Sequence, residues 1–260
     1  MPDLEFEVAD GVGTVTLNRP DRRNAFTLAM IDRCHDVFCD SRRDESVRAV
    51  VVRGAGGAFC SGVDLDELES QPQTPLEHKS LLTDRVHRLA YALDDFDKPV
   101  IAAVDGVAVG AGMDISLMCD IRLASRTARF SQGYVRVGLV PGDGGCYLLP
   151  RLVGMARALE LMWTGDFVGA EEAERIGLVS HVHEQPELDA AAHDLARRLA
   201  DGPGVAISMI KRAAYQCART DLRTALDLIS SHQAVVQSTQ DSTEAIRAFR
   251  EKREPVFRGR

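Results

Sequence analysis

Two short, largely apolar runs and the amphipathic stretch between them predict an α/β fold. The runs are Val47–Val52, interrupted only by Arg48, and Val100–Val104, and apolar runs of this length are typical of strands covered on both faces. Residues 76–95, between them, keep helical spacing. From residue 188 onward only helical patterns occur. We therefore expect a body rich in strands and helices over 1–190, followed by a helical region over 191–260.

The first quarter of the chain predicts a hairpin, a helix and a buried strand. Leu4–Ala9 and Gly13–Leu17 alternate apolar and polar side chains around Asp10-Gly11, which is the pattern of a two-stranded hairpin. Thr27 is a suitable cap for a helix that reaches about Ser41. After the strand at 47–52, a glycine-rich turn from Gly54 to Leu65 leads into an expected mobile loop over 67–75 and the amphipathic helix over 76–95.

Lys98-Pro99 precedes the central strand, Val100–Val104, and a helix follows the glycines at 110 and 112. The expected later elements are two short strands (121–125, 128–130), three short helices (148–153, 156–164, 170–176), a strand (179–182) and four helices (188–201, 205–217, 222–237, 241–252). The last helices are amphipathic, so they are expected to pack on the body or on another subunit.

Composition excludes several classes of protein. The formal net charge of −8 argues against a general nucleic-acid binder. No signal peptide is visible at the acidic N-terminus, and no apolar run approaches the roughly 20 residues of a membrane-spanning helix. The six cysteines include no CxxC pair, which favours reduced thiols. We expect a soluble, cytoplasmic protein with no membrane partner.

The turn Gly110-Ala111-Gly112, between the central strand and an apolar helix, is the first candidate site. Glycines on both sides of Ala111 allow a ligand to approach the backbone closely. The first N–H groups of a helix have no intrahelical partner and carry the positive end of its dipole. Asp114 follows three positions later, and its side chain leans back toward these groups. The segment predicts an anion clamp beside a titratable acid; the alternative is a plain strand–turn–helix junction.

Seven short motifs occur in order along the chain. They are N-R-P-x-x-x-N-A at 18–25, A-F-C-S-G-V-D-L at 58–65, D-G-V-A-V-G-A-G-M-D at 105–114, G-L-V-P-G-D-G-G at 138–145, L-P-R-L-V-G at 149–154, A-x-x-x-G-L-V at 173–179 and E-K-R-x-P-x-F at 251–257. Together they resemble the crotonase (enoyl-CoA hydratase/isomerase) superfamily over nearly the whole chain. The resemblance implies a spiral of β-β-α turns, with a C-terminal helical region that builds trimers or dimers of trimers.

The resemblance also implies an acyl-CoA thioester as substrate, no metal, and no cofactor other than the coenzyme A of the substrate. It assigns two backbone donors of an oxyanion hole to Val63 and Ala111. Most family members have glycine where this chain has Ala111, and the donor survives if the backbone there allows a Cβ. Negative charge grows on the thioester oxygen in an enolate, and each donor of this kind contributes roughly 3–4 kcal/mol to stabilising the transition state.

The proton-transfer groups depart from the family pattern. Hydratases of the family generally use two glutamates, where this chain has Asp114 and Tyr134. Several isomerases have a catalytic aspartate one residue before the position of Asp143. Tyrosine, with a reference pKa of about 10, is no carboxylate base, but it donates hydrogen bonds. Asp114 is therefore the expected acid/base, assisted by Asp143 or Tyr134; alternatively, Asp143 is only a turn residue.

By resemblance, coenzyme A lies along 22–25 and 60–64. Arg22 and Arg23 are candidate phosphate partners, because guanidinium groups bind phosphates through paired hydrogen bonds, and Lys252 and Arg258 are weaker candidates; the alternative for all four is an ordinary solvated surface. The other expected substrate-binding residues are Ala25, Ser61, Asp64, Leu65, Gly110, Pro141 and Phe257.

Histidines suggest little by their spacing. His181 and His183 share one face of an expected strand, but no third ligand is near in sequence, which favours a surface strand over a metal site. His78 and His87, nine residues apart in the expected helix, are assigned to the surface.

The sequence thus predicts an enoyl-CoA hydratase, which adds water syn to a 2-enoyl-CoA through a thioester enolate. The first alternative is an enoyl-CoA Δ3-Δ2 or dienoyl-CoA isomerase. The others are an acyl-CoA hydrolase and a weakly catalytic acyl-CoA-binding protein.

Overall fold

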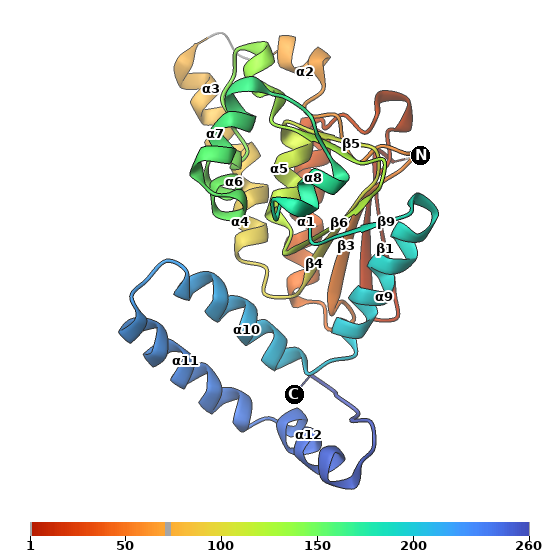
Figure 1. The fold of residues 1–260 in the computed structure, drawn as a ribbon, viewed down its shortest axis with the longest axis vertical. Coiled ribbons are helices and arrows are strands. Elements are labelled where there is room, and N and C mark those ends of the chain that lie inside the picture. Colours follow the sequence, from red (N-terminus) through yellow and green to blue (C-terminus); the bar gives the residue numbers. More distant parts are fainter. Residues whose placement is uncertain (1, 71–73, 260) are drawn as a thin grey trace.

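The computed structural model describes residues 2–70 and 74–259. Its larger sheet has six strands in the order β1-β2-β3-β4-β6-β9, and its smaller sheet has three, β5-β7-β8 (Figure 1). The chain repeatedly makes two strands and then a helix, and the second strand of a later repeat joins the small sheet, as in β4-β5-α5. The expected α/β spiral of β-β-α turns is confirmed.

The expected N-terminal hairpin is confirmed. Strand β1 (Leu4–Ala9) pairs antiparallel with β2 (Val12–Leu17), and Leu4 lies opposite Leu17. Asp10 and Gly11 in the turn have φ of 50° and 79°, the left-handed conformation that a tight hairpin turn requires. From β2 onward each neighbour in the large sheet runs parallel: β3 (Ala49–Gly54), β4 (Val100–Val104), β6 (Ile121–Ser125) and β9 (His181–His183).

Helices cover both faces of the large sheet. Because alternate residues of a strand face opposite sides, Val50 and Val52 join the core formed with α1 (Leu28–Arg43), while Val51 packs with α9 (Leu188–Ala200). The Thr27 side chain caps α1 by accepting from the Met30 N–H, as expected. The predicted boundary between residues 190 and 191 falls inside α9, which lies on the sheet.

The helix expected over 76–95 is present but not regular. It consists of α3 (Pro75–Leu81), a π turn, η2 (Leu82–Val86), and α4 (His87–Asp94). The loop expected over 67–75 is wrong at its start, where α2 (Leu65–Glu69) is capped by the Asp64 side chain. Residues 71–73 of that loop lie outside the described residues.

The small sheet carries the elements nearest the candidate site. It contains β5 (Val107–Val109), β7 (Arg129–Ser131) and β8 (Val168–Gly169). Helix α5 (Ala111–Met118) begins two residues after β5, and a short 3₁₀ helix, η3 (Gly133–Val137), follows β7. Strands β5 and β8 are too short to show a periodic pattern, so the sequence did not reveal them.

The remaining helices match the expected ones within a few residues. They are α6 (Gly145–Val153), α7 (Met155–Thr164), α8 (Ala170–Arg175), α10 (Gly204–Cys217), α11 (Leu222–Gln237) and α12 (Gln240–Glu251). Short 3₁₀ turns occur at Pro20–Arg22 (η1) and Gln185–Glu187 (η4).

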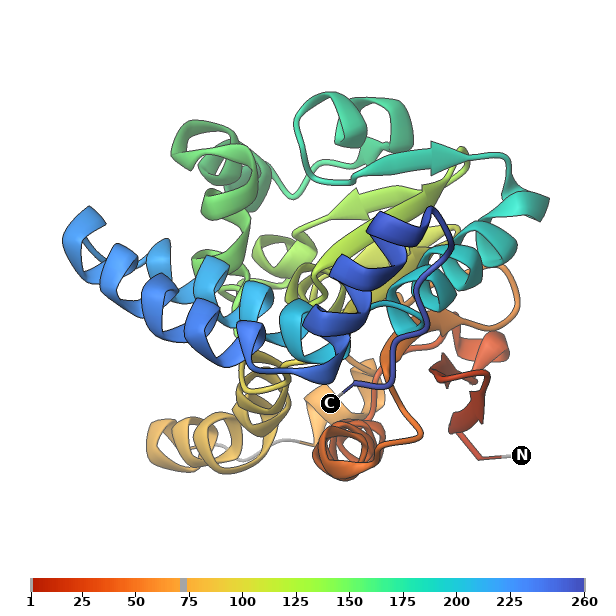
Figure 2. The same cartoon turned by 90° about the horizontal axis from the view of Figure 1, so that it is seen from below.

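The helical region projects beyond the sheet (Figure 1), and Figure 2 shows α10 and α11 running side by side. Lys211 of α10 joins it to the body through a 2.7 Å ion pair with Asp120. Large apolar side chains on these helices remain exposed, among them Ile210, Leu222 and Phe249. Within residues 2–70 and 74–259, no helix has the length and apolarity needed to span a membrane.

Candidate active site

Two glycine-bounded turns lie side by side at the start of α5. The Cys60 N–H donates to Val107 O (2.9 Å), and the Val109 N–H donates to Cys60 O (3.0 Å). A Cβ on Gly62 would lie 3.0 Å from Val109 O, so the two backbones are in contact there. Val63 follows Gly62 on the first turn, and Ala111 follows Gly110 on the second. The two amides that the sequence singles out, 48 positions apart, are thus brought to neighbouring turns.

The N–H groups of Val63 and Ala111 are the two candidate oxyanion donors. Within the part of the chain that the structure describes, neither the Val63 N–H nor the Ala111 N–H donates a hydrogen bond. Ala111 is the first residue of α5, so its N–H is one of those that helix geometry leaves unpaired. Gly110, not Ala111, has the positive φ (51°). The alanine therefore fits a backbone where most relatives of the resembled superfamily have glycine.

Asp114 lies one helical turn further along α5 and is fully buried. Its carboxylate accepts from the Gln132 side-chain amide (2.6 Å) and from the Gly145 N–H (3.1 Å). Its pKa is raised to about 7, mainly by burial and next by the nearby Asp143, against the hydrogen bonds, which lower it. Asp114 is therefore poised to exchange a proton near neutral pH.

Gly145 shows how tightly the acid is enclosed. A Cβ at this position would lie 2.4 Å from Asp114 Oδ1 and 2.9 Å from Gln132 Nε2, so any larger residue would displace the carboxylate. Gln132 is fully buried, and its Oε1 has no hydrogen-bond partner among the described residues. The glycine-rich segment after Pro141 thus packs directly against Asp114 and Gln132.

Tyr134, in η3, links Asp114 to a second carboxyl group. Its hydroxyl lies 3.0 Å from Asp114 Oδ2 and is also hydrogen-bonded to Asp143 Oδ2. Burial raises the pKa of Tyr134 well above 10, and the two aspartates raise it further, so the phenol keeps its proton. Burial likewise raises the pKa of Asp143, against the Tyr134 hydrogen bond and His87, which lower it.

A proton count constrains this network. A phenol has one proton, so it donates to one carboxylate, and its oxygen accepts from the other carboxyl group only when that group is protonated. Both hydrogen bonds therefore form together when Asp114 and Asp143 share one negative charge. Raised pKa values on both acids agree with such sharing. The network can hold its proton at either end without moving a heavy atom.

The structure brings the three predicted proton-transfer residues, Asp114, Tyr134 and Asp143, into one network. Sequence reasoning missed two neighbours, Gln132 and His87. Gln132 carried no signal beyond its place two residues before Tyr134. The surface assignment of His87 is wrong: the ring is half-buried, and its Nε2 lies 2.9 Å from Gly142 O, because the loop of residues 138–145 folds over this helix.

The predicted binding segments 22–25 and 60–64 lie together. The Ser61 N–H donates to Arg23 O (3.0 Å), and the Ser61 hydroxyl donates to Arg22 O (3.3 Å). Both arginine side chains are exposed; that of Arg22 pairs with Asp66 at 2.7 Å. Ala25 is half-buried beside them. The phosphate-binding roles of Arg22 and Arg23 stay predictions.

Other predicted binding residues occupy varied surroundings. Asp64 is buried, pairs with Arg19 at 2.8 Å and caps α2, so its carboxylate already has protein partners. Leu65 is 63% exposed. Gly110 faces the ring of Tyr134, and Pro141 lies against the Gly145 backbone. Gly110 and Pro141 thus adjoin the acid network, whereas Asp64 serves the fold.

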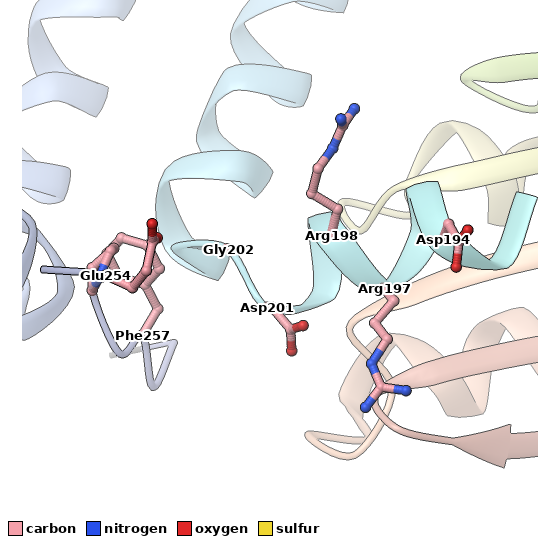
Figure 3. Close-up of a pocket in the computed structure, with 8 residues that line it drawn as sticks. Asp194, Arg197, Arg198, Asp201, Gly202, Glu254 and Phe257 are labelled. Atoms are coloured by element: carbon pink, nitrogen blue, oxygen red, sulfur yellow. The ribbon is translucent and has the colours of Figure 1, made fainter. Parts of the chain in front are cut away.

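Phe257 lies elsewhere, in a cavity of about 470 Å³ between the end of α9 and the C-terminal segment (Figure 3). Its other lining residues are Asp194, Arg197, Arg198, Asp201, Gly202, Glu254 and Pro255. None belongs to the Asp114 network, so Phe257 is separate from it. The weaker candidates Lys252 and Arg258 are exposed on the same C-terminal segment. In the described parts of the chain, no cluster of three His, Cys, Asp or Glu side chains has the arrangement of a metal site.

Comparisons with known proteins agree with this architecture. Residues 7–260 match the model of the enoyl-CoA hydratase/isomerase family. The chain is 37% identical to 1,2-epoxyphenylacetyl-CoA isomerase of Escherichia coli (99% of this chain, 100% of the relative). It is 38% identical to short-chain-enoyl-CoA hydratase of Clostridium acetobutylicum (93% and 92%). A crystal structure of a putative enoyl-CoA hydratase from Streptomyces coelicolor superposes with a TM-score of 0.94 at 41% identity (100% and 95%).

Proposed function

This chain belongs to the enoyl-CoA hydratase/isomerase family, and on that premise we propose that it moves the carbon–carbon double bond of an enoyl-CoA thioester. The observation that carries the proposal is the hydroxyl of Tyr134 between two carboxyl groups, those of Asp114 and Asp143. Moving a double bond requires one proton to be removed and another to be returned nearby. Two acids that share one proton supply both.

The oxyanion site forms the first part of the mechanism. The thioester carbonyl accepts hydrogen bonds from the Val63 and Ala111 amides. When a proton leaves Cα of a 3-enoyl thioester, the electron pair is delocalised onto that oxygen as a dienolate. Donors fixed in advance stabilise this charge without reorganising. Ala111 also adds the positive end of the α5 dipole.

The acids perform the proton transfers. Asp114, one helical turn from the oxyanion donor, removes the Cα proton as a carboxylate and becomes protonated. Asp143, protonated at the start, gives its proton to Cγ, and the double bond shifts from Cβ–Cγ to Cα–Cβ. The substrate has exchanged one proton for another, and the negative charge has moved from Asp114 to Asp143.

Tyr134 restores the starting state. Protonated Asp114 donates to the phenol oxygen while the phenol proton passes to Asp143. Two protons move together, and the network returns to charged Asp114 and neutral Asp143. Gln132 and Gly145 both donate to Asp114, which favours the charge at that end.

Hydration of a 2-enoyl thioester is the second candidate. It is favoured by the relatives named as hydratases and by an acid whose pKa is raised to about 7 beside the oxyanion turn. Hydratases of the family generally use two glutamates to hold the water molecule, and this chain has Asp114 and Tyr134 at those positions. In this chain the Tyr134 hydroxyl bridges the two carboxyl groups instead, and for that reason we place isomerisation first.

The experiment offers the enzyme a 3-enoyl-CoA and a 2-enoyl-CoA of the same length and follows the absorbance of the conjugated thioester. Isomerisation raises the absorbance with the 3-enoyl substrate, and Tyr134→Phe should slow it by about 10²-fold. If the absorbance falls with the 2-enoyl substrate and does not change with the 3-enoyl substrate, the enzyme is a hydratase and the proposed isomerase activity is wrong. Release of free thiol would indicate a hydrolase, and tight binding without turnover a binding protein.

We further propose that the chain assembles as a trimer or a dimer of trimers through its helical region. Exposed apolar side chains on α10, α11 and α12 support this, because such surfaces are covered in a stable assembly. Light scattering of the purified protein should give a mass of three or six chains, and a monomer would contradict the proposal.

A further inference from the structure

The loop that carries Asp143 has little rigidity of its own. Asp143 stands between Gly142 and Gly144, and Gly144 has a φ of 114°, a conformation that favours glycine. Flexible residues on both sides would let the Asp143 carboxyl group occupy several positions, whereas reacting groups must be held closely in place. Contacts from outside the loop must therefore fix the position of Asp143. Tyr134 is hydrogen-bonded to its carboxyl group, and the backbone of the loop needs a contact of its own.

His87 contacts the backbone of this loop at Gly142. Its Nε2 lies 2.9 Å from Gly142 O. A carbonyl oxygen only accepts, so Nε2 carries the proton and donates. Gly142 immediately precedes Asp143, so this bond holds the peptide from which the carboxyl group projects. His87 is also close enough to Asp143 to lower the pKa of that acid.

The backbone beneath His87 is unusual and well anchored. The His87 N–H closes the π turn by bonding to Leu82 O, five residues earlier. A π turn adds one residue to a helical turn, and such turns are frequent at functional sites. Arg85, inside the turn, pairs with Asp32 of α1 through both Nε (2.9 Å) and Nη2 (2.5 Å). The Leu82 side chain also lies against Gly142.

We propose that His87 is a positioning residue of the reaction: by holding the Gly142 carbonyl, it places Asp143 against Tyr134. The inference rests on the proposed function, since it matters to catalysis only if Asp143 transfers a proton. Asp143 stands one residue away from the aspartate position of the resembled isomerases, and the donor on the π turn explains how a shifted acid reaches the network.

The test compares His87→Phe, which keeps a ring but removes the donor, with His87→Gln, which keeps an N–H at a similar reach. His87→Phe should lower kcat for isomerisation about tenfold with little change in KM. His87→Gln should recover most of that loss. His78→Phe is the matched control, since His78 is exposed on the same helical run and should leave kcat unchanged.

A double-mutant comparison separates positioning from a general structural effect. If His87 acts through Asp143, His87→Phe should change kcat less than twofold when Asp143 is already asparagine. An equal tenfold loss in both backgrounds would overturn the proposal, and so would failure of His87→Gln to recover activity in a protein that folds normally.

Amide hydrogen exchange over residues 138–148 gives a readout that needs no activity. His87→Phe should speed exchange there, and His87→Gln should restore protection. If the wild-type protein isomerises nothing but exchange responds in this way, the proposed function fails while the positioning contact stands. If exchange is unchanged by His87→Phe, the positioning inference itself is wrong.

Discussion

Asp64 and Asp114 are two buried aspartates that follow neighbouring turns, yet their surroundings give them opposite properties. Asp64 is 4% exposed and pairs with Arg19 at 2.8 Å; the hydrogen bond from Arg19 lowers its pKa. Asp114 is fully buried, and its described hydrogen-bond partners are neutral. Burial therefore raises its pKa to about 7. The contrast indicates that a hydrogen-bonded cation keeps the pKa of Asp64 low, whereas Asp114 has no such partner among the described residues.

The largest expected effect is the loss of activity when Asp114, which follows the turn at residues 110–112, is replaced. Asp114→Asn should lower kcat by about 10²–10⁴-fold, because asparagine transfers no proton, while acyl-CoA binding is retained. Turnover of 3-enoyl-CoA and binding by calorimetry measure both. Asp64→Asn is the companion variant and should keep most of the activity. An equal loss of kcat in Asp114→Asn and Asp64→Asn would contradict the assignment of catalysis to Asp114 and not to Asp64.

The second effect is on stability at alkaline pH. The folded pKa of Asp114 lies above its unfolded value of 3.8, so its protonation stabilises the fold fully below pH 3.8, and this contribution is lost as the pH rises through about 7. At pH 8 the buried charge costs up to about 4 kcal/mol. Asp114→Asn should therefore raise the free energy of unfolding more at pH 8 than at pH 5. Urea titrations at the two pH values measure this, and a destabilised variant at pH 8 would contradict it.

The third effect concerns Asp64, where the pH dependence of stability has the opposite sign to that at Asp114. The pKa of Asp64 is lowered, so its stabilising contribution is present above the unfolded pKa and is lost as the pH falls through the folded pKa. Asp64→Asn should cost about 2 kcal/mol at pH 7, since it removes a hydrogen bond between charged groups. The cost should shrink in acid, as urea denaturation at pH 7 and pH 3 can show. A cost that is the same at both pH values would mean that the ion pair is not its source.

The smallest effect concerns the pH profile. The Gln132 amide donates to Asp114 and lowers its pKa, so Gln132→Met should move the acid limb of kcat to higher pH, by about one unit or less. Substitution at the exposed Gln185 serves as the control. A limb that stays in place would show that Gln132 does not set the pKa of Asp114.

Local patterns predicted most elements because buried strands and amphipathic helices show their periodicity directly. The hairpin at 4–17 and the four last helices are confirmed within a few residues. The π turn at 82–86 and the short strand β5 escaped notice because neither has a period long enough to recognise. The surface assignment of His87 failed for a related reason: a helix face shows spacing but not what folds over it.

The sequence by itself determined the family and the order of most strands and helices, and it placed an acid one helical turn after a glycine-bounded bend. These features depend on the spacing of residues close together in the chain, which determines where helices, strands and turns form. The tertiary structure alone decided which acid titrates. Arg19 lies 45 residues before Asp64, while Gln132, Tyr134 and Asp143 reach Asp114 from two later segments. A pKa depends on excluded water and on charges brought near through space, and no local pattern records either.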